Sequence, residues 1–299
     1  MAYKLDPGCP VDDEVRRVAA ELLEKAVERL RTEPEPAVAD VHTARTSLKK
    51  VRSLLRLVRA EVGDNRWRHV DRRIGDCGRA LSALRDADVG AATFDDLSPA
   101  LAGAVDADTV ARVRSALAGD AAEARARARD HSTSGAVADD LGCIMVAVDG
   151  WYIRDRGFAI VAAGIERQYR LGRAALAALA AQPDDEELHD LRKRAKDLWY
   201  HLLLVGPVWP PVTEVLADQA HHLSNLLGDD HDLAVLRETL TGRHQVTAGE
   251  GGEALIEVID ARRAVIQAEA RTMAARLFAD KPRAHTARLG HWWAAAAGR

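Results

Sequence analysis

The chain has 299 residues, of which 47% are hydrophobic and 29% charged, so it can bury a core and is not disordered by composition. No apolar run approaches the roughly 20 residues that a membrane span needs, and the first ten residues lack the apolar stretch of a signal peptide. The formal net charge of −4 disfavours a globally basic nucleic-acid binder, and three widely spaced cysteines exclude a disulfide framework. We therefore expect a cytoplasmic protein that folds as one large domain or two modest ones.

Helices dominate the predicted elements. Alanine is abundant, aromatic residues make up 4%, and alternating runs of β-branched residues are missing. In chain order, the pattern predicts helices over residues 12–31, 38–61, 65–90, 105–130, 138–150, 156–181, 185–205, 212–240, 251–279 and 283–297. Gly63 follows the second of these and Gly206-Pro207 follows the seventh, as expected at helix ends. The predicted fold class is all-α.

The predicted helix that begins at residue 38 has two adjacent stripes of side chains. Its apolar stripe recurs at steps of three and four and should face a core: Val41, Ala44, Leu48, Val51, Leu55 and Val58. One residue further on, about 100° around the helix, the same steps select a basic stripe: His42, Arg45, Lys49, Arg52, Arg56 and Arg59. Asp40 is the one acid between residues 38 and 60, so repulsion among these cations is unrelieved within the helix. An anion that neutralises the stripe explains the pattern better than a plain solvated face.

A second segment repeats this arrangement. His42-x-x-Arg45-x-x-x-Lys49 matches His189-x-x-Arg192-x-x-x-Lys196, and residues 81–89 resemble residues 227–235 at nearly the same offset. The two matches predict duplicated antiparallel bundles, 12–135 and 150–280, related by a pseudo-twofold and sharing a basic groove. Asp86 and Asp232 fall at matching places. We expect them to orient an arginine or histidine of the groove, because an acid that touched a polyanion would be repelled.

The residue types favour a ligand with phosphate or carboxylate groups. The planar fork of arginine suits phosphate oxygens, and a stripe from His42 to Arg59 spans about 26 Å at 1.5 Å per residue, which suits a chain of phosphates better than a nucleotide. No GxxxxGK[ST] loop is present, and the aromatics are too few to stack a row of bases. The predicted binding residues are His42, Arg45, Lys49, Arg52, Arg56, Arg72, Arg79, Arg170, Arg173, His189, Arg192, Lys193 and Lys196.

These segments resemble the CHAD family, the histidine-bearing α-helical domain. VHTARTSLKKVRSLLRLVR and LHDLRKRAKDLWY match the family's first motif, and LSALRDADV and LLGDDHDLAVL match its second. The resemblance covers nearly the whole chain, so it implies one CHAD-like domain over residues 1–299 that binds inorganic polyphosphate, with polyphosphate granules as a further partner. The second half departs from the family pattern, because Trp199 stands where members often have arginine and Leu203 stands where they have an acid.

Two other functions stay open beside non-catalytic binding. Asp229-Asp230-His231-Asp232, with His221 and His222 nearby, suggests an HD-like metal-dependent phosphohydrolase, although nothing singles out the further ligands that such a site needs. The same groove could also serve an RNA- or protein-interaction module. The leading prediction is a polyphosphate-binding protein that is not an enzyme and uses no metal, cofactor or membrane, with nucleic acid a disfavoured partner.

Overall fold

The computed structural model describes residues 3–32, 36–81, 86–128, 133–153, 157–180, 183–244, 246 and 250–298, with the side chains of 86–88, 124–128, 133 and 250 left out. Within these ranges the chain forms helices and no strand, apart from one isolated bridge between Ala102 and Val105. The all-α prediction is confirmed. None of the described helices is both long and apolar enough to cross a bilayer.

The helices follow the predicted order, with two predicted helices divided. They are α1 (Val11–Leu30), α2 (Val38–Leu57), α3 (Arg59–Val62), α4 (Asp64–Ala80), α5 (Asp86–Asp96), α6 (Ser98–Leu101), α7 (Ala107–Ala128), α8 (Thr133–Asp149), α9 (Ala159–Ala178), α10 (Asp185–Leu204), α11 (Pro210–Glu238), α12 (Glu250–Leu277) and α13 (Pro282–Ala296). A 3-10 turn, η1 (Gly206–Val208), precedes α11, and a π turn, η2 (Thr239–Arg243), follows it. The predicted helix 38–61 divides into α2 and α3. Within the predicted helix 65–90, α4 ends at Ala80, and α5 continues past the predicted end to Asp96; α6 was not predicted.

Local sequence signals explain several of these boundaries. Asp184 caps α10 by accepting a hydrogen bond from the backbone N–H of Glu187 at 2.8 Å, and the Glu187 carboxylate accepts a hydrogen bond from the Asp184 N–H at 3.3 Å. Gly63 ends α3 at a φ of 89°, a left-handed conformation that glycine adopts without strain. Pro210 starts α11, where a missing N–H costs nothing.

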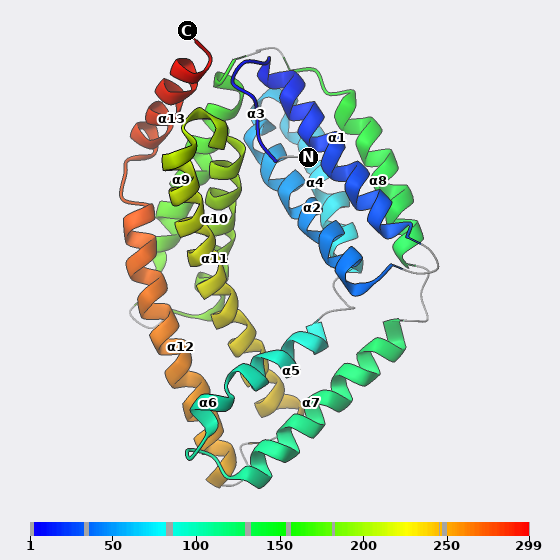
Figure 1. The fold of residues 1–299 in the computed structure, drawn as a ribbon, viewed down its shortest axis with the longest axis vertical. Coiled ribbons are helices and arrows are strands. Elements are labelled where there is room, and N and C mark those ends of the chain that lie inside the picture. The colour runs from blue at the N-terminus through cyan, green and yellow to red at the C-terminus, as the bar shows by residue number, and fades with distance from the viewer. Residues whose placement is uncertain are drawn as a thin grey trace.

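Two hydrophobic cores organise the helices. The first gathers α1, α2, α4 and α8, together with the start of α9 and the end of α10. The second gathers most of α10, α11 and α12 with α5, α6 and α7, including the fully buried Phe94. Figure 1 shows α5 and α7 below the helices of the first core, reaching across to α11 and α12. The helices α5–α7 lie in the first half of the sequence yet pack in the second core, and the duplicated halves 12–135 and 150–280 stay a prediction.

The predicted apolar stripe of α2 and the matching stripe of α10 are buried throughout. On α2 they are Val41, Ala44, Leu48, Val51, Leu55 and Val58, and on α10 and just after it Leu188, Leu191, Ala195, Leu198, Leu202 and Val205. At roughly 1.5–3 kcal/mol for burying each large aliphatic side chain, these rows fix the rotation of both helices about their axes. The neighbouring basic stripes therefore lie at the edges of buried faces, as the sequence predicts.

Candidate functional site

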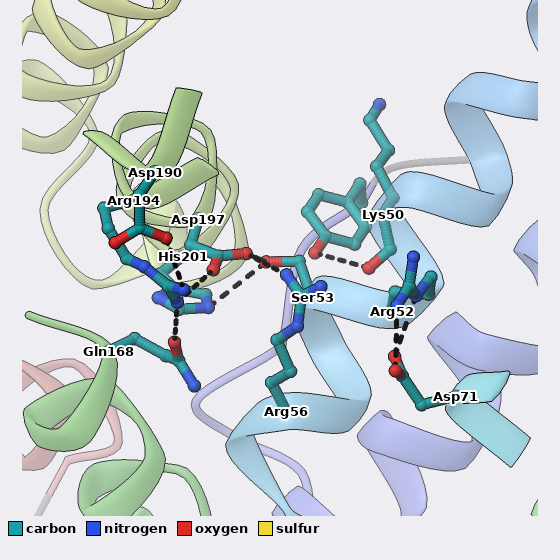
Figure 2. Close-up of polar contacts among 11 residues, drawn as sticks. Lys50, Arg52, Ser53, Arg56, Asp71, Gln168, Asp190, Arg194, Asp197 and His201 are labelled. Carbon is teal, nitrogen blue, oxygen red and sulfur yellow. Dashed lines mark hydrogen bonds and ion pairs between the residues drawn. The ribbon is translucent and has the colours of Figure 1, made fainter. Parts of the chain in front are cut away.

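The helices α2 and α10 meet at a polar contact near their C-terminal ends. Arg56 Nη1 lies 2.7 Å from Oδ1 of Asp197, and the Ser53 hydroxyl donates to the same oxygen at 3.2 Å. Figure 2 shows Ser53 and Arg56 of α2 pointing toward Asp197 of α10. Asp197 is only 2% exposed, so its charge depends on these partners. We call Ser53, Arg56, Asp197 and His201 the α2–α10 joint.

A buried histidine and an arginine extend the joint toward α9. His201 Nε2 lies 3.2 Å from the Ser53 hydroxyl oxygen, and burial lowers the pKa of His201 to about 4, so its ring is neutral at pH 7. Arg194 donates to Gln168 Oε1 at 3.1 Å and to Asp190 at 3.2 Å, and it lies 3.7 Å from Asp197 Oδ2 (Figure 2). The joint thus ties three helices together through hydrogen bonds and ion pairs.

The C-terminal cations of the α2 stripe have acidic partners on other helices. Arg52 binds both carboxylate oxygens of Asp71 on α4, each at 2.8 Å, and Arg56 pairs with Asp197. The expectation that this stripe lacks acidic partners is therefore wrong for Arg52 and Arg56, and also for Arg59, which binds the carboxylate of Asp64 at 2.6 and 2.8 Å. Sequence reasoning missed Asp71 and Asp197 because it compared charges within one helix, whereas these acids come from neighbouring helices.

The N-terminal part of the α2 stripe has a different environment. Arg45 donates from Nη1 to the Leu81 carbonyl at 3.2 Å, at the end of α4, which holds its half-buried guanidinium over that helix. His42 and Lys49, on either side of it along the stripe, are exposed. This stretch therefore presents a histidine and a lysine to solvent beside a positioned arginine.

The stripe on α10 has a similar arrangement over α11. The guanidinium of Arg192 lies against Gly228, where a Cβ would be in ordinary van der Waals contact with Nη2 at 3.4 Å. Leu81 and Gly228 both belong to the second repeated motif, so each motif arginine contacts the second motif of its own half. Lys193 is exposed and Lys196 half-buried.

Two histidines lie together beside Arg192. The rings of His189 and His231 are 5.3 Å apart, and His189 Nδ1 is buried without a hydrogen-bond partner among the described atoms. Burial, reinforced by Lys193 and His231, lowers the pKa of His189, and burial with Arg192 lowers that of His231. Both rings are therefore neutral at pH 7 and would gain affinity for a proton next to an anion.

The remaining predicted cations differ in their surroundings. Among the described residues, neither Arg72 nor Lys193 has a carboxylate within ion-pair distance, and both are exposed. Arg79 pairs with Asp76, and Arg170 pairs with Glu166 at 2.8 Å, each within its own helix.

Arg173 occupies a different kind of place from the one predicted. Its Nη1 donates to the carbonyls of Phe278, Ala279 and Asp280 at 2.6–2.9 Å. These carbonyls follow the last residue of α12, where a cation is favoured by the helix dipole. In this structure Arg173 caps α12 and does not contribute to the stripes on α2 and α10.

The two predicted orienting acids have different outcomes. The side chain of Asp86 lies outside the described residues. Asp232 is half-buried next to His231. Its negative charge partly offsets the lowering of the His231 pKa by burial. Beyond Lys196 the α10 stripe turns aromatic, and the Trp199 ring stacks on His221 with centroids 3.8 Å apart.

The acidic run on α11 includes a buried aspartate that is bound by α12. Asp230 is 1% exposed and accepts hydrogen bonds from Arg263 at 3.1 Å and Gln267 at 2.8 Å, both on α12. Across the part of the chain that the structure describes, no three His, Cys, Asp or Glu residues gather closely enough to hold a metal ion. Asp230 therefore joins α11 to α12.

Known proteins resemble this chain in sequence and in fold. A family profile described as the CHAD domain matches residues 13–241. The crystal structure of the CHAD domain from the plant Ricinus communis is similar at a TM-score of 0.60 and 20% identity, over 90% of this chain and 89% of that one. PptA from Streptomyces chartreusis is similar at a TM-score of 0.66 and 14% identity, over 91% of this chain and 100% of that one. A search of curated proteins found no significant match. At these identities the structural likeness concerns the fold.

Proposed function

This chain belongs to the CHAD domain family, and we propose that it binds inorganic polyphosphate, or a similar linear polyanion, without catalysis and in the cytoplasm. The binding surface that we propose consists of the N-terminal stretches of the α2 and α10 stripes, His42, Arg45 and Lys49 on one helix and His189, Arg192 and Lys196 on the other. Arg72 and Lys193 extend it as exposed cations.

One observation carries the proposal: the C-terminal ends of the two stripes meet at one contact. Arg56 belongs to the α2 stripe, and it bonds to Asp197, which directly follows Lys196 on α10. From this joint each stripe continues toward the N-terminus of its own helix. Two rows of basic side chains that meet at one end suit a ligand with many regularly spaced negative charges better than a single small anion.

One of the two motif arginines, Arg45, is held in place before any ligand arrives. Arg45 is fixed by the Leu81 carbonyl, and Arg192 lies against Gly228. A guanidinium that is already oriented loses less conformational freedom when it binds a phosphate. His189 adds a buried ring nitrogen without a protein partner, which a phosphate oxygen could use once the ring is protonated.

The alternatives receive less support from the described residues. A metal-dependent phosphohydrolase would need the acids of α11, but Asp230 is already bound by Arg263 and Gln267. An RNA-binding surface would need open aromatic faces for base stacking. Trp199, the aromatic residue within the α10 stripe, already stacks on His221.

A titration with polyphosphates of graded length tests the proposal. Isothermal calorimetry should show affinity that rises with chain length and little binding of monophosphate. The double variant Arg45→Ala/Lys49→Ala should weaken binding strongly, whereas the matched variant Lys281→Ala/Arg283→Ala, which removes two exposed cations near the start of α13, should bind as wild type does. Equal affinity for monophosphate and long chains, or equal loss in the two variants, would contradict the proposal.

A further inference from the structure

A pocket separate from the cationic stripes opens where four helices meet. It has a volume of about 420 Å³, within the range of small-molecule sites, and α10, α11, α12 and α13 all contribute to it. We call it the α10–α13 pocket. Its α10 residues, Leu198 and Leu202, belong to the apolar stripe of that helix and not to the basic one.

The floor of the pocket is aliphatic. Leu198 and Leu202 come from α10, Leu216 from α11, and Met273 and Leu277 from α12, so α10 and α12 each contribute a pair one helical turn apart. His285 of α13 completes the wall and is 5% exposed, and its ring stacks on Tyr169 with centroids 4.1 Å apart. Burial lowers the pKa of His285 to about 4, so this wall is uncharged at pH 7.

The rim of the pocket is polar and has one cation without a carboxylate partner. Arg288 pairs with Asp280 at 2.8 Å and lies over the ring of Trp292, so its charge is matched. Arg276 is exposed at the rim, and no carboxylate of the described residues lies within ion-pair distance of it. The carbonyls that follow α12 would repel an anion, but three of them already accept hydrogen bonds from Arg173. The rim therefore presents a net positive charge above an apolar floor.

We propose that the α10–α13 pocket binds a small amphipathic monocarboxylate, with the hydrocarbon body against the leucines and Met273 and the carboxylate on Arg276. A guanidinium fork matches a carboxylate in geometry as well as charge. An inorganic phosphate chain does not fit this pocket, because it has no apolar part to cover the five aliphatic side chains. The site is thus distinct in chemistry and in place from the proposed polyphosphate surface.

Methionine labelling gives a direct test, because the chain has three methionines and one of them lines the pocket. With ¹³C-methyl methionine, titration with decanoate should shift the Met273 signal saturably and leave that of Met145, which packs beside the first core, unchanged. Decanol and decylammonium share the chain length of decanoate but lack its charge, so both should bind more weakly, decylammonium most of all.

Two variants complete the test. Arg276→Gln should weaken decanoate binding about tenfold, whereas Arg283→Gln, which removes an exposed arginine of α13 that does not line the pocket, should leave it unchanged. Leu216→Trp should fill the pocket and abolish the Met273 shift. The proposal is overturned if Met145 and Met273 shift alike, if decylammonium binds as well as decanoate, or if the two arginine variants behave the same.

Discussion

The helices α2 and α10 start with the same His-x-x-Arg-x-x-x-Lys motif but continue it differently. On α2 the next cations, Arg52 and Arg56, bind acids of α4 and α10. On α10 the stripe ends at Trp199, which stacks on His221. The two helices therefore share the first three positions of the stripe and diverge where they approach each other. We infer that the shared positions serve the ligand and the divergent ones hold the helices together.

The largest expected effect concerns the joint. Asp197→Ala leaves Arg56 and Arg194 without their buried carboxylate, and breaking such a pair costs about 3–5 kcal/mol of unfolding free energy. Asp139→Ala removes the acid of an exposed pair with Arg31 and should cost less than about 1 kcal/mol. Urea unfolding of both variants checks this difference. Similar small losses would show that the joint is not what holds α2 to α10.

The next effect separates the ligand positions from the core. Arg45→Ala/Lys49→Ala and Arg192→Ala/Lys196→Ala should each weaken polyphosphate binding by about 2–3 kcal/mol, since each charged hydrogen bond contributes roughly 1.5–3 kcal/mol and the losses do not add simply. Calorimetric titration of both doubles measures whether the two helices contribute equally. A loss confined to one double would show that the shared motif does not have a shared role.

Leu48→Ala is the matched control on α2, because Leu48 directly precedes Lys49 and is 2% exposed. It should lower the free energy of unfolding by about 2–5 kcal/mol through a core cavity and leave polyphosphate affinity unchanged in the folded protein. If Leu48→Ala weakened binding as much as the doubles do, the apolar and basic stripes would not be separable.

Acid should weaken the joint through His201. Burial lowers the pKa of His201 to about 4 in the folded protein, whereas its ordinary pKa is 6.5. When the pH falls below 6.5, this histidine therefore binds a proton in the unfolded chain but stays neutral in the folded one. The contribution of His201 to the free energy of unfolding should therefore fall as the pH drops from about 6.5 toward 4, and the loss should reach about 2 kcal/mol at pH 5. Urea unfolding at pH 7 and pH 5 should show that His201→Gln reduces this loss, while His222→Gln, at an exposed position, keeps it in full.

The smallest expected effect is on polyphosphate affinity, which should rise as the pH falls, whereas the stability contribution of His201 falls. Burial and neighbouring cations lower the pKa of His189 in the free protein, and a bound phosphate should raise it. Binding then takes up protons, so polyphosphate affinity should increase by about 1 kcal/mol between pH 8 and pH 6. The double variant His42→Ala/His189→Ala should remove most of this increase. A double variant with the full pH dependence would mean that these histidines do not contact the ligand.

The spacing of residues in the sequence predicted those features of the site that depend on one helix alone. The buried rows of α2 and α10 and their basic neighbours follow from steps of three and four, because one strongly patterned helix fixes which side faces a core. The partners of the stripe could not be predicted this way. Asp71 reaches Arg52 from α4, and Arg173 meets carbonyls after α12, contacts that depend on how distant helices pack.

The salt dependence of polyphosphate affinity tests the central claim most directly. If the two stripes neutralise several phosphates, the logarithm of the affinity should fall linearly with the logarithm of the salt concentration. By analogy with nucleic acids, the slope should be about 0.7–0.9 per phosphate contact. The account predicts a steep slope for the wild type that becomes shallower in Arg45→Ala/Lys49→Ala. Affinity that stays flat from low to physiological salt would contradict it.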